Sequence, residues 1–221
     1  MKPLPRPLAG VFFDLDGTLA DSARDLHDAL SALCHERDIP VPPFERVRET
    51  VSRGARAVLR CAFGDDEALV DAVLPRFLEL YVETGMVNTH AFAGVDALLE
   101  NLEARRVPWG VVSNKAAALV ALVLEKLGYD SRAAAVVGGD SLPQRKPDPA
   151  PVRHACALAG VEPAGCVFVG DDPRDILAGH AAGLYTVAAG WGYLDGADPH
   201  DWRPDAVSAD AAQLSAMLDG A

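Results

Sequence analysis

The 221-residue sequence has no apolar run that approaches the roughly 18 residues needed to cross a bilayer. Charged or turn-forming residues interrupt each run first. The first run, residues 8–15, contains Asp14 and follows scattered prolines, so it lacks the basic start, apolar centre and cleavage site of a signal peptide. These features predict a cytoplasmic protein that does not associate with a membrane.

Paired-cysteine motifs and runs of basic residues are also missing. The cysteines are Cys34, Cys61, Cys156 and Cys166. None forms a Cys-x-x-Cys pair, and their surroundings are apolar, which favours buried thiols over disulfides or zinc ligands. The net charge of −12 disfavours a nucleic-acid partner. An anionic small substrate would then need a local positive site, which a divalent metal ion and one or two Lys or Arg side chains can supply.

Short apolar runs alternate with amphipathic stretches in most of the chain. Runs with β-branched or aromatic residues predict strands at 10–13, 109–113, 134–138, 166–170 and 184–188. Between the last four, helices are predicted at 115–127, 148–159 and 174–182. This alternation is typical of an α/β fold, a doubly wound, Rossmann-like parallel sheet with helices on both faces.

Two intervals depart from this alternation. Between residues 20 and 88, four stretches favour helix (24–37, 44–50, 55–63 and 66–84), which predicts a helical insertion after the first strand. Pro75 should end or kink the last of them, so two helices are expected there. Residues 189–205 are too rich in Gly, Pro and Asp for regular structure, and such a loop often borders a functional site.

Reactive side chains follow the predicted strands, and ligands of open α/β sheets bind beyond these strand ends. The first strand leads into Asp14-Leu15-Asp16-Gly17-Thr18-Leu19. A calcium-binding turn is the alternative interpretation of this segment, but Ala23 stands where such a loop needs a glutamate.

Three further strand ends carry polar motifs, each with an ordinary structural alternative. The motif 113–115 is Ser-Asn-Lys at a helix start, where Ser113 could be a simple N-cap. Lys146 stands in Arg-Lys-Pro-Asp-Pro (145–149) and could be a surface lysine. The motif 170–175, Gly-Asp-Asp-Pro-Arg-Asp, places three acids at a strand end, where Asp175 could serve the first helical turn alone.

The combination of motifs is more informative than each one. The order DxDGTL, SN, KPDP and GDDxxD along one α/β core resembles the haloacid dehalogenase superfamily over essentially the whole chain. The resemblance implies a catalytic core of residues 1–19 and 89–221, with a helical cap of residues 20–88. It also implies a central first strand, flanked by the strands that lead to Ser113 and Asp171.

The resemblance implies a Mg²⁺-dependent phosphomonoesterase. Asp14 is then the nucleophile, and Mg²⁺ is held by Asp14, Asp171 and the backbone carbonyl of Asp16. Asp16 protonates the leaving alkoxide and later activates water. The implied phosphate-binding residues are Ser113, Asn114 and Lys146. Asp172 and Asp175 are implied either as metal ligands or as acids that orient metal-bound water.

Within the superfamily, the chain is similar to the phosphoglycolate phosphatase group and to N-acetylmuramic acid 6-phosphate phosphatases. The segment 51–56, Val-Ser-Arg-Gly-Ala-Arg, opens a cap helix and makes Arg53 and Arg56 candidates for substrate specificity. Alternatively, both arginines are solvated or pair with Glu45 and Glu49. Two alternatives remain: a sugar phosphate mutase, which shares all four motifs, and a non-catalytic phosphate-binding protein on the same fold. The expected partner is a small phosphate ester, and the expected assembly is a monomer or homodimer.

Overall fold

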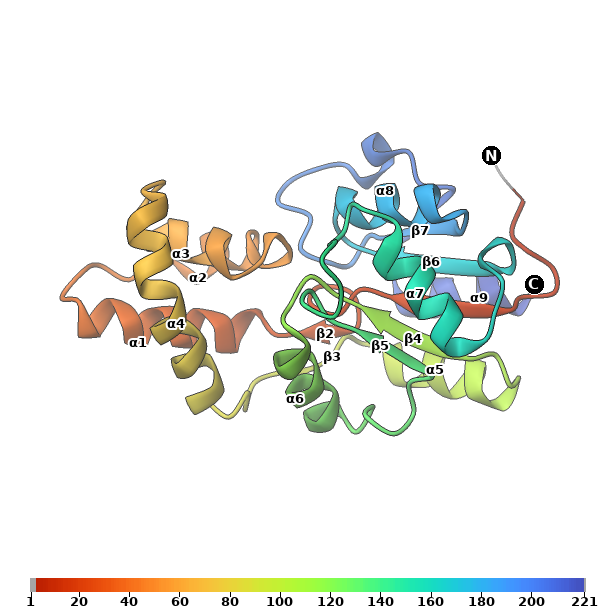
Figure 1. The fold of residues 1–221 in the computed structure, drawn as a ribbon, viewed down its shortest axis with the longest axis horizontal. Coiled ribbons are helices and arrows are strands. Elements are labelled where there is room, and N and C mark those ends of the chain that lie inside the picture. Colours follow the sequence, from red (N-terminus) through yellow and green to blue (C-terminus); the bar gives the residue numbers. More distant parts are fainter. Residues whose placement is uncertain (1–2, 221) are drawn as a thin grey trace.

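A computed structural model describes residues 3–220 and contains a six-stranded parallel sheet (Figure 1). The strands lie in the order β5-β4-β1-β6-β7-β8. Their bounds are β1 Gly10–Phe13, β4 Trp109–Val112, β5 Ala135–Val137, β6 Cys166–Gly170, β7 Tyr185–Ala189 and β8 Ala206–Ser208. The predicted α/β class is confirmed, and β1 lies between the strands that lead to Ser113 and Asp171, as the resemblance implies.

Both faces of the sheet are buried because helices cover each of them. In β1, Val11 and Phe13 belong to one apolar cluster and Phe12 to the other, as alternating side chains of a strand require. Helices α5 (Val95–Ala104), α6 (Ala117–Leu127) and α9 (Ala211–Asp219) contribute to the first cluster. Helices α7 (Ala150–Ala159) and α8 (Pro173–Ala182) contribute to the second.

Four helices between residues 23 and 83 form a separate layer beside the sheet (Figure 1). They are α1 (Ala23–Glu36), α2 (Phe44–Arg48), α3 (Ala55–Phe63) and α4 (Glu67–Glu83). We call this layer the cap. The prediction of two helices around Pro75 is wrong, because α4 runs through the proline. Buried residues on both sides of it, Val70 and Phe77 among them, keep one continuous face packed in the core.

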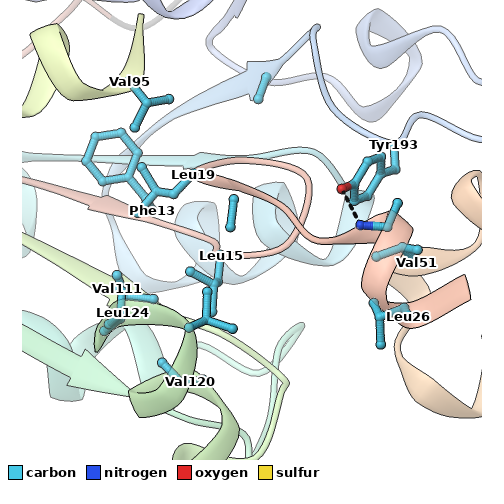
Figure 2. Packing of buried hydrophobic residues seen from close by; sticks show 14 of the residues in the cluster. Phe13, Leu15, Leu19, Leu26, Val51, Val95, Val111, Val120, Leu124 and Tyr193 are labelled. Carbon is cyan, nitrogen blue, oxygen red and sulfur yellow. Dashed lines mark hydrogen bonds between the residues drawn. The ribbon is translucent and has the colours of Figure 1, made fainter. Parts of the chain in front are cut away.

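A short ribbon joins the cap to the sheet layer. Strand β2 (Ala20–Asp21) pairs antiparallel with β3 (His90–Ala91), where the chain leaves the sheet layer and returns. The hydroxyl of Tyr193 accepts hydrogen bonds from the backbone N–H groups of Ser22 and Ala23, at 2.9 and 3.1 Å, and donates one to Asp21 (2.6 Å). Figure 2 shows the hydroxyl of Tyr193 directed at the backbone where the chain enters the cap. The cap boundaries 20 and 88 stay a prediction.

The remaining chemical expectations concern thiols and membranes. All four cysteines are free, and Cys34, Cys156 and Cys166 are buried, which confirms the interpretation as thiols. Cys61 is partly buried. Within residues 3–220, no helix combines the length and the apolar character needed to span a bilayer.

Candidate active site

Three neighbouring strands deliver their following residues to one edge of the sheet. Asp14, Ser113 and Asp171 come directly after β1, β4 and β6. The register pairs Phe13 with Val111 on one side and with Val169 on the other, so the strands end together. The backbone N–H of Asp14 continues the ladder with a bond of 2.9 Å to the Val169 carbonyl. Parallel pairing therefore gathers Asp14, Ser113 and Asp171, which lie 58 to 157 residues apart in the chain.

The turn after β1 depends on glycine. Gly17 has a φ of +89°, and a Cβ atom at this position would lie 1.9 Å from Oδ2 of Asp171. The carbonyl of Leu15 accepts bonds from the N–H groups of Leu19 (3.0 Å) and Ala20 (2.9 Å), which closes the turn. Both the backbone conformation and the close approach of Asp171 exclude a side chain here.

Three buried carboxylates meet at this edge, from Asp14, Asp171 and Asp175. One oxygen from each lies within 4.8 Å of the others. Lys146 is paired with two of them, at 2.8 Å from Oδ1 of Asp14 and 2.7 Å from Oδ1 of Asp175. Burial raises the pKa of Asp175 to about 7, against the opposing charge of Lys146. Burial, followed by the charges of Asp14 and Asp175, raises the pKa of Asp171 well above its usual range.

This cluster fits a divalent cation. Carboxylate oxygens are the ligands that Mg²⁺ prefers. Burial and the neighbouring charges of Asp14 and Asp175 raise the pKa of Asp171, so a cation in the cluster would stabilise its ionised form. The cluster contains Asp14 and Asp171, whose carboxylates the resemblance implies as ligands. Its third member is Asp175, which the resemblance left open as a ligand or as an acid that orients metal-bound water.

Asp172 stabilises the start of helix α8. Its side chain caps α8 by accepting from the backbone N–H of Arg174 (2.9 Å). It also forms two bonds with the Arg174 guanidinium, at 2.7 and 2.9 Å. The carboxylate of Asp175 accepts a hydrogen bond from the backbone N–H of Asp172 (3.1 Å), which completes a capping box. The GDDxxD motif thus orders the start of α8 as well as the acid cluster.

Asp16 occupies a different environment from Asp14. Nζ of Lys115 lies 3.0 and 3.1 Å from its two carboxylate oxygens, and the Ser22 hydroxyl donates to it at 2.5 Å. Lys115 also donates to the Tyr81 hydroxyl (3.2 Å) from cap helix α4. The sequence did not single out Lys115, although it stands in the Ser-Asn-Lys motif, because nothing in the motif indicates a contact with a partly buried acid 99 residues earlier.

The two remaining candidates for phosphate binding, Ser113 and Asn114, directly follow β4. The amide of Asn114 donates to the Lys146 carbonyl (2.9 Å) and accepts from the Lys146 backbone N–H (3.0 Å). Asn114 therefore fixes the backbone that carries the lysine. Ser113 is buried, and its hydroxyl accepts from the backbone N–H of Lys115 (3.3 Å).

A cavity of about 410 Å³ lies between the cap and this edge of the sheet. Asp14, Asp16 and Lys146 line it from the sheet side, and Tyr81 lines it from the cap. The cap loop that opens α3 closes another side. In that loop, the Ser52 hydroxyl donates to Oδ2 of Asp171 (2.6 Å), which couples the cap directly to the acid cluster.

Both candidate arginines of the cap loop line the same cavity. Neither pairs with Glu45 or Glu49, the partners weighed from the sequence. Arg53 forms an ion pair with Asp195, in the loop after β7, and Arg56 forms one with Asp71 of α4. The loop after β7 also reaches the acid cluster, because the backbone N–H of Tyr193 donates to Oδ2 of Asp171 (2.8 Å).

Known proteins match the chain in sequence and in structure. The family model of haloacid dehalogenase-like hydrolases matches residues 11–189. A phosphoglycolate phosphatase of Xanthomonas campestris pv. campestris is 43% identical over 206 residues, covering 92% of this chain and 93% of that protein. An N-acetylmuramic acid 6-phosphate phosphatase of Pseudomonas aeruginosa is 36% identical over 217 residues, covering 97% and 96%.

The solved structures agree with these relatives. The crystal structure of a predicted phosphoglycolate phosphatase from Haemophilus somnus superposes with a TM-score of 0.84 at 29% identity, covering 94% of this chain and 96% of that one. The motifs, the sheet order and these similarities lead to one assignment. The chain belongs to the haloacid dehalogenase-like hydrolase family, in its phosphoglycolate phosphatase-like group.

Proposed function

We propose that the protein is a Mg²⁺-dependent phosphomonoesterase that hydrolyses a small phosphorylated metabolite through an aspartyl-phosphate on Asp14. One observation carries the proposal. Asp14 lines the cavity, its Oδ1 lies 2.8 Å from Nζ of Lys146, and its carboxylate shares the acid cluster with Asp171 and Asp175. A nucleophile, a cation for the phosphate and an acidic metal site are thereby within reach of one phosphoryl group.

The reaction consists of two displacements at phosphorus. In the first, an Asp14 oxygen bonds to phosphorus while the ester bond breaks and Asp16 transfers a proton to the leaving oxygen. In the second, ionised Asp16 takes a proton from water, whose oxygen bonds to phosphorus and releases Asp14 and inorganic phosphate. Lys146 and Ser113 hold non-bridging oxygens throughout. Asp14, Asp171 and Asp175, with the Asp16 carbonyl, would hold Mg²⁺, which would supply positive charge that offsets the charge of the phosphate.

The size of the cavity favours a large leaving group. Its volume of about 410 Å³ lies within the range of roughly 300–1,000 Å³ for pockets that hold drug-sized ligands. A sugar such as N-acetylmuramic acid would use this space, whereas the two carbons of glycolate would leave most of it to water. The first candidate substrate is therefore N-acetylmuramic acid 6-phosphate. The second is 2-phosphoglycolate, because the 43% identical relative carries that name.

A panel of phosphate esters tests the proposal. We expect kcat/KM to be highest for N-acetylmuramic acid 6-phosphate, with 2-phosphoglycolate, glucose 6-phosphate and p-nitrophenyl phosphate as comparisons. Isomerisation of glucose 1-phosphate without release of inorganic phosphate would instead indicate a mutase. Binding of phosphate esters without turnover of any of them would indicate a non-catalytic protein. A cytoplasmic location stays a prediction from the sequence.

Metal dependence has its own expected result. EDTA should abolish release of inorganic phosphate from p-nitrophenyl phosphate, and added Mg²⁺ should restore it, because the acid cluster repels the phosphate dianion unless a cation offsets its charge. Turnover that persists after dialysis against EDTA would contradict the proposed metal site.

A further inference from the structure

A buried lysine stands where the cap meets the sheet layer. Lys115 exposes 9% of its side chain, in the segment that joins β4 to α6. Burial of an ammonium group is unfavourable unless its charge is paired and its donors are satisfied. Nζ of Lys115 lies 3.0 Å from Oδ1 of Asp16, so the charge of the lysine is paired with that of the acid.

All three donors of this ammonium group have protein partners. Two are directed at the oxygens of Asp16, at 3.0 and 3.1 Å, and one at the hydroxyl of Tyr81, at 3.2 Å. The ammonium also lies 4.6 Å from the centroid of the Tyr81 ring. No donor is left for a substrate phosphate in this arrangement. The ammonium group of Lys115 therefore binds Asp16 and not the phosphoryl group.

The partners of Asp16 come from separate segments. The Ser22 hydroxyl, from the link into the cap, donates to Asp16 at 2.5 Å, and Lys115 contacts Asp16 from the segment that joins β4 to α6. Tyr81 belongs to cap helix α4 and is completely buried. The orientation of Asp16 is therefore determined by the core and the cap together.

We infer that Lys115 is a positioning residue that aims Asp16 at the leaving oxygen, and that the Tyr81 hydroxyl makes this positioning depend on the docked cap. The inference rests on the proposed function of Asp16. An acid transfers a proton efficiently only within hydrogen-bond reach of the leaving oxygen. Lys115 limits the rotation of the short Asp16 side chain, and Tyr81 presents its hydroxyl to Lys115 only when α4 is in place.

The test is the variant Lys115→Met, which keeps an unbranched side chain and removes the charge. The readout is kcat/KM, which includes steps only up to ester cleavage, for alkyl and aryl phosphates. We expect kcat/KM for alkyl phosphates to fall about 10- to 100-fold, a part of the roughly 10²- to 10⁴-fold that general acid catalysis contributes. For p-nitrophenyl phosphate we expect a loss below about 3-fold, because p-nitrophenolate leaves without a proton.

Two more variants sharpen the comparison. Tyr81→Phe keeps the buried ring and removes the hydroxyl. It should give an alkyl-selective loss of about 2- to 10-fold, smaller than that of Lys115→Met because the pairing of Lys115 with Asp16 remains. Lys126→Met removes an exposed lysine from helix α6, which follows the segment of Lys115, and should leave the hydrolysis of both substrates unchanged. Thermal unfolding of each variant checks that it is folded.

These measurements distinguish a failure of the inference about Lys115 from a failure of the proposed function. Equal losses for alkyl and aryl esters in Lys115→Met would overturn the inference and assign Lys115 to the phosphate or to folding. If Lys115→Met does not fold, Tyr81→Phe decides, and an unselective or absent effect in that variant overturns the inference. A wild-type protein that hydrolyses no ester would instead refute the proposed function itself, which the wild-type panel reveals before any variant is measured.

Discussion

Asp14 combines burial with a charged partner. It is 6% exposed and lies 2.8 Å from Nζ of Lys146. Asp14→Asn keeps the shape of the side chain but removes the nucleophilic oxygen, so we expect kcat to fall by about 10⁴-fold or more. Rapid quench followed by mass spectrometry should show a phosphorylated Asp14 in the wild type and none in the variant.

The exposed Asp130 provides the control, since Asp130→Asn changes the same functional group away from the site. Activity of the Asp14→Asn variant equal to that of Asp130→Asn would exclude the proposed nucleophile.

A second prediction at the residue scale concerns the turn at Gly17, where a side chain would displace Asp171. Gly17→Ala adds a Cβ atom 1.9 Å from Oδ2 of Asp171 at a φ of +89°. Gly128, which ends α6, has a φ of +71° and open space where its Cβ would be. Gly128→Ala should therefore lower the free energy of unfolding by about 1–2 kcal/mol, from the backbone conformation alone.

Gly17→Ala should lower the free energy of unfolding by more than Gly128→Ala and should also weaken Mg²⁺ binding, because Asp171 has to move. Chemical denaturation measures the first effect and titration calorimetry the second. Equal destabilisation of the two variants, with unchanged Mg²⁺ affinity, would show that the turn adapts without displacing Asp171.

At the scale of elements, the cap loop and α3 present two arginines to the cavity. Arg56 pairs with Asp71 inside the cap, whereas Arg53 pairs with Asp195 across to the loop after β7. We expect Arg56 to bind a substrate carboxylate and Arg53 to hold the cap against the sheet layer. Arg56→Ala should then lower kcat/KM for a carboxylated substrate about 10- to 150-fold, the effect of a charge-assisted hydrogen bond of about 1.5–3 kcal/mol.

Hydrolysis of p-nitrophenyl phosphate, which has no carboxylate, should decrease much less in Arg56→Ala. Arg60→Ala is a matched control, because Arg60 lies on the same helix, pairs with Glu67 and does not line the cavity. Equal losses for aryl and carboxylated substrates in Arg56→Ala would assign Arg56 to cap closure, in the same way as Arg53.

For the molecule as a whole, the buried acids link stability to pH. The pKa of Asp175 rises from an ordinary 3.8 to about 7 in the folded chain, mainly through burial. Between these values the folded chain binds more protons than the unfolded chain, so the free energy of unfolding of the metal-free protein should decrease as pH rises from about 4 to about 7. The raised pKa of Asp171 acts in the same direction.

Mg²⁺ competes with these protons, so it should raise the melting temperature more at pH 8 than at pH 5. Thermal unfolding in EDTA and in Mg²⁺ at both pH values measures this difference. Asp175→Asn removes one titrating group and should reduce the pH dependence of the metal-free protein. An identical Mg²⁺ stabilisation at pH 5 and pH 8 would contradict the link between the acid cluster and the metal.

Local sequence determined the α/β core and the candidate residues on its strand ends. A strand such as β1 is readable because buried parallel strands are continuous apolar runs, and Asp14 follows it directly. Helix α5 was also readable from the spacing of Val95, Leu98, Leu99 and Leu102, although it was not predicted. Strand β8, with three residues, and helix α9 were missed as well, since short elements at the edge of a fold carry a weak periodic signal.

Tertiary structure decided what the spacing of residues cannot encode. Lys115 contacts an acid 99 residues away and a cap tyrosine 34 residues away, and Ser52 contacts Asp171 across 119 residues. These contacts depend on how the cap packs on the sheet layer, which is a property of two surfaces and not of a motif. Packing also explains why α4 continues past Pro75. The free energy gained by burying its continuous apolar face exceeds the cost of the backbone hydrogen bond lost at the proline.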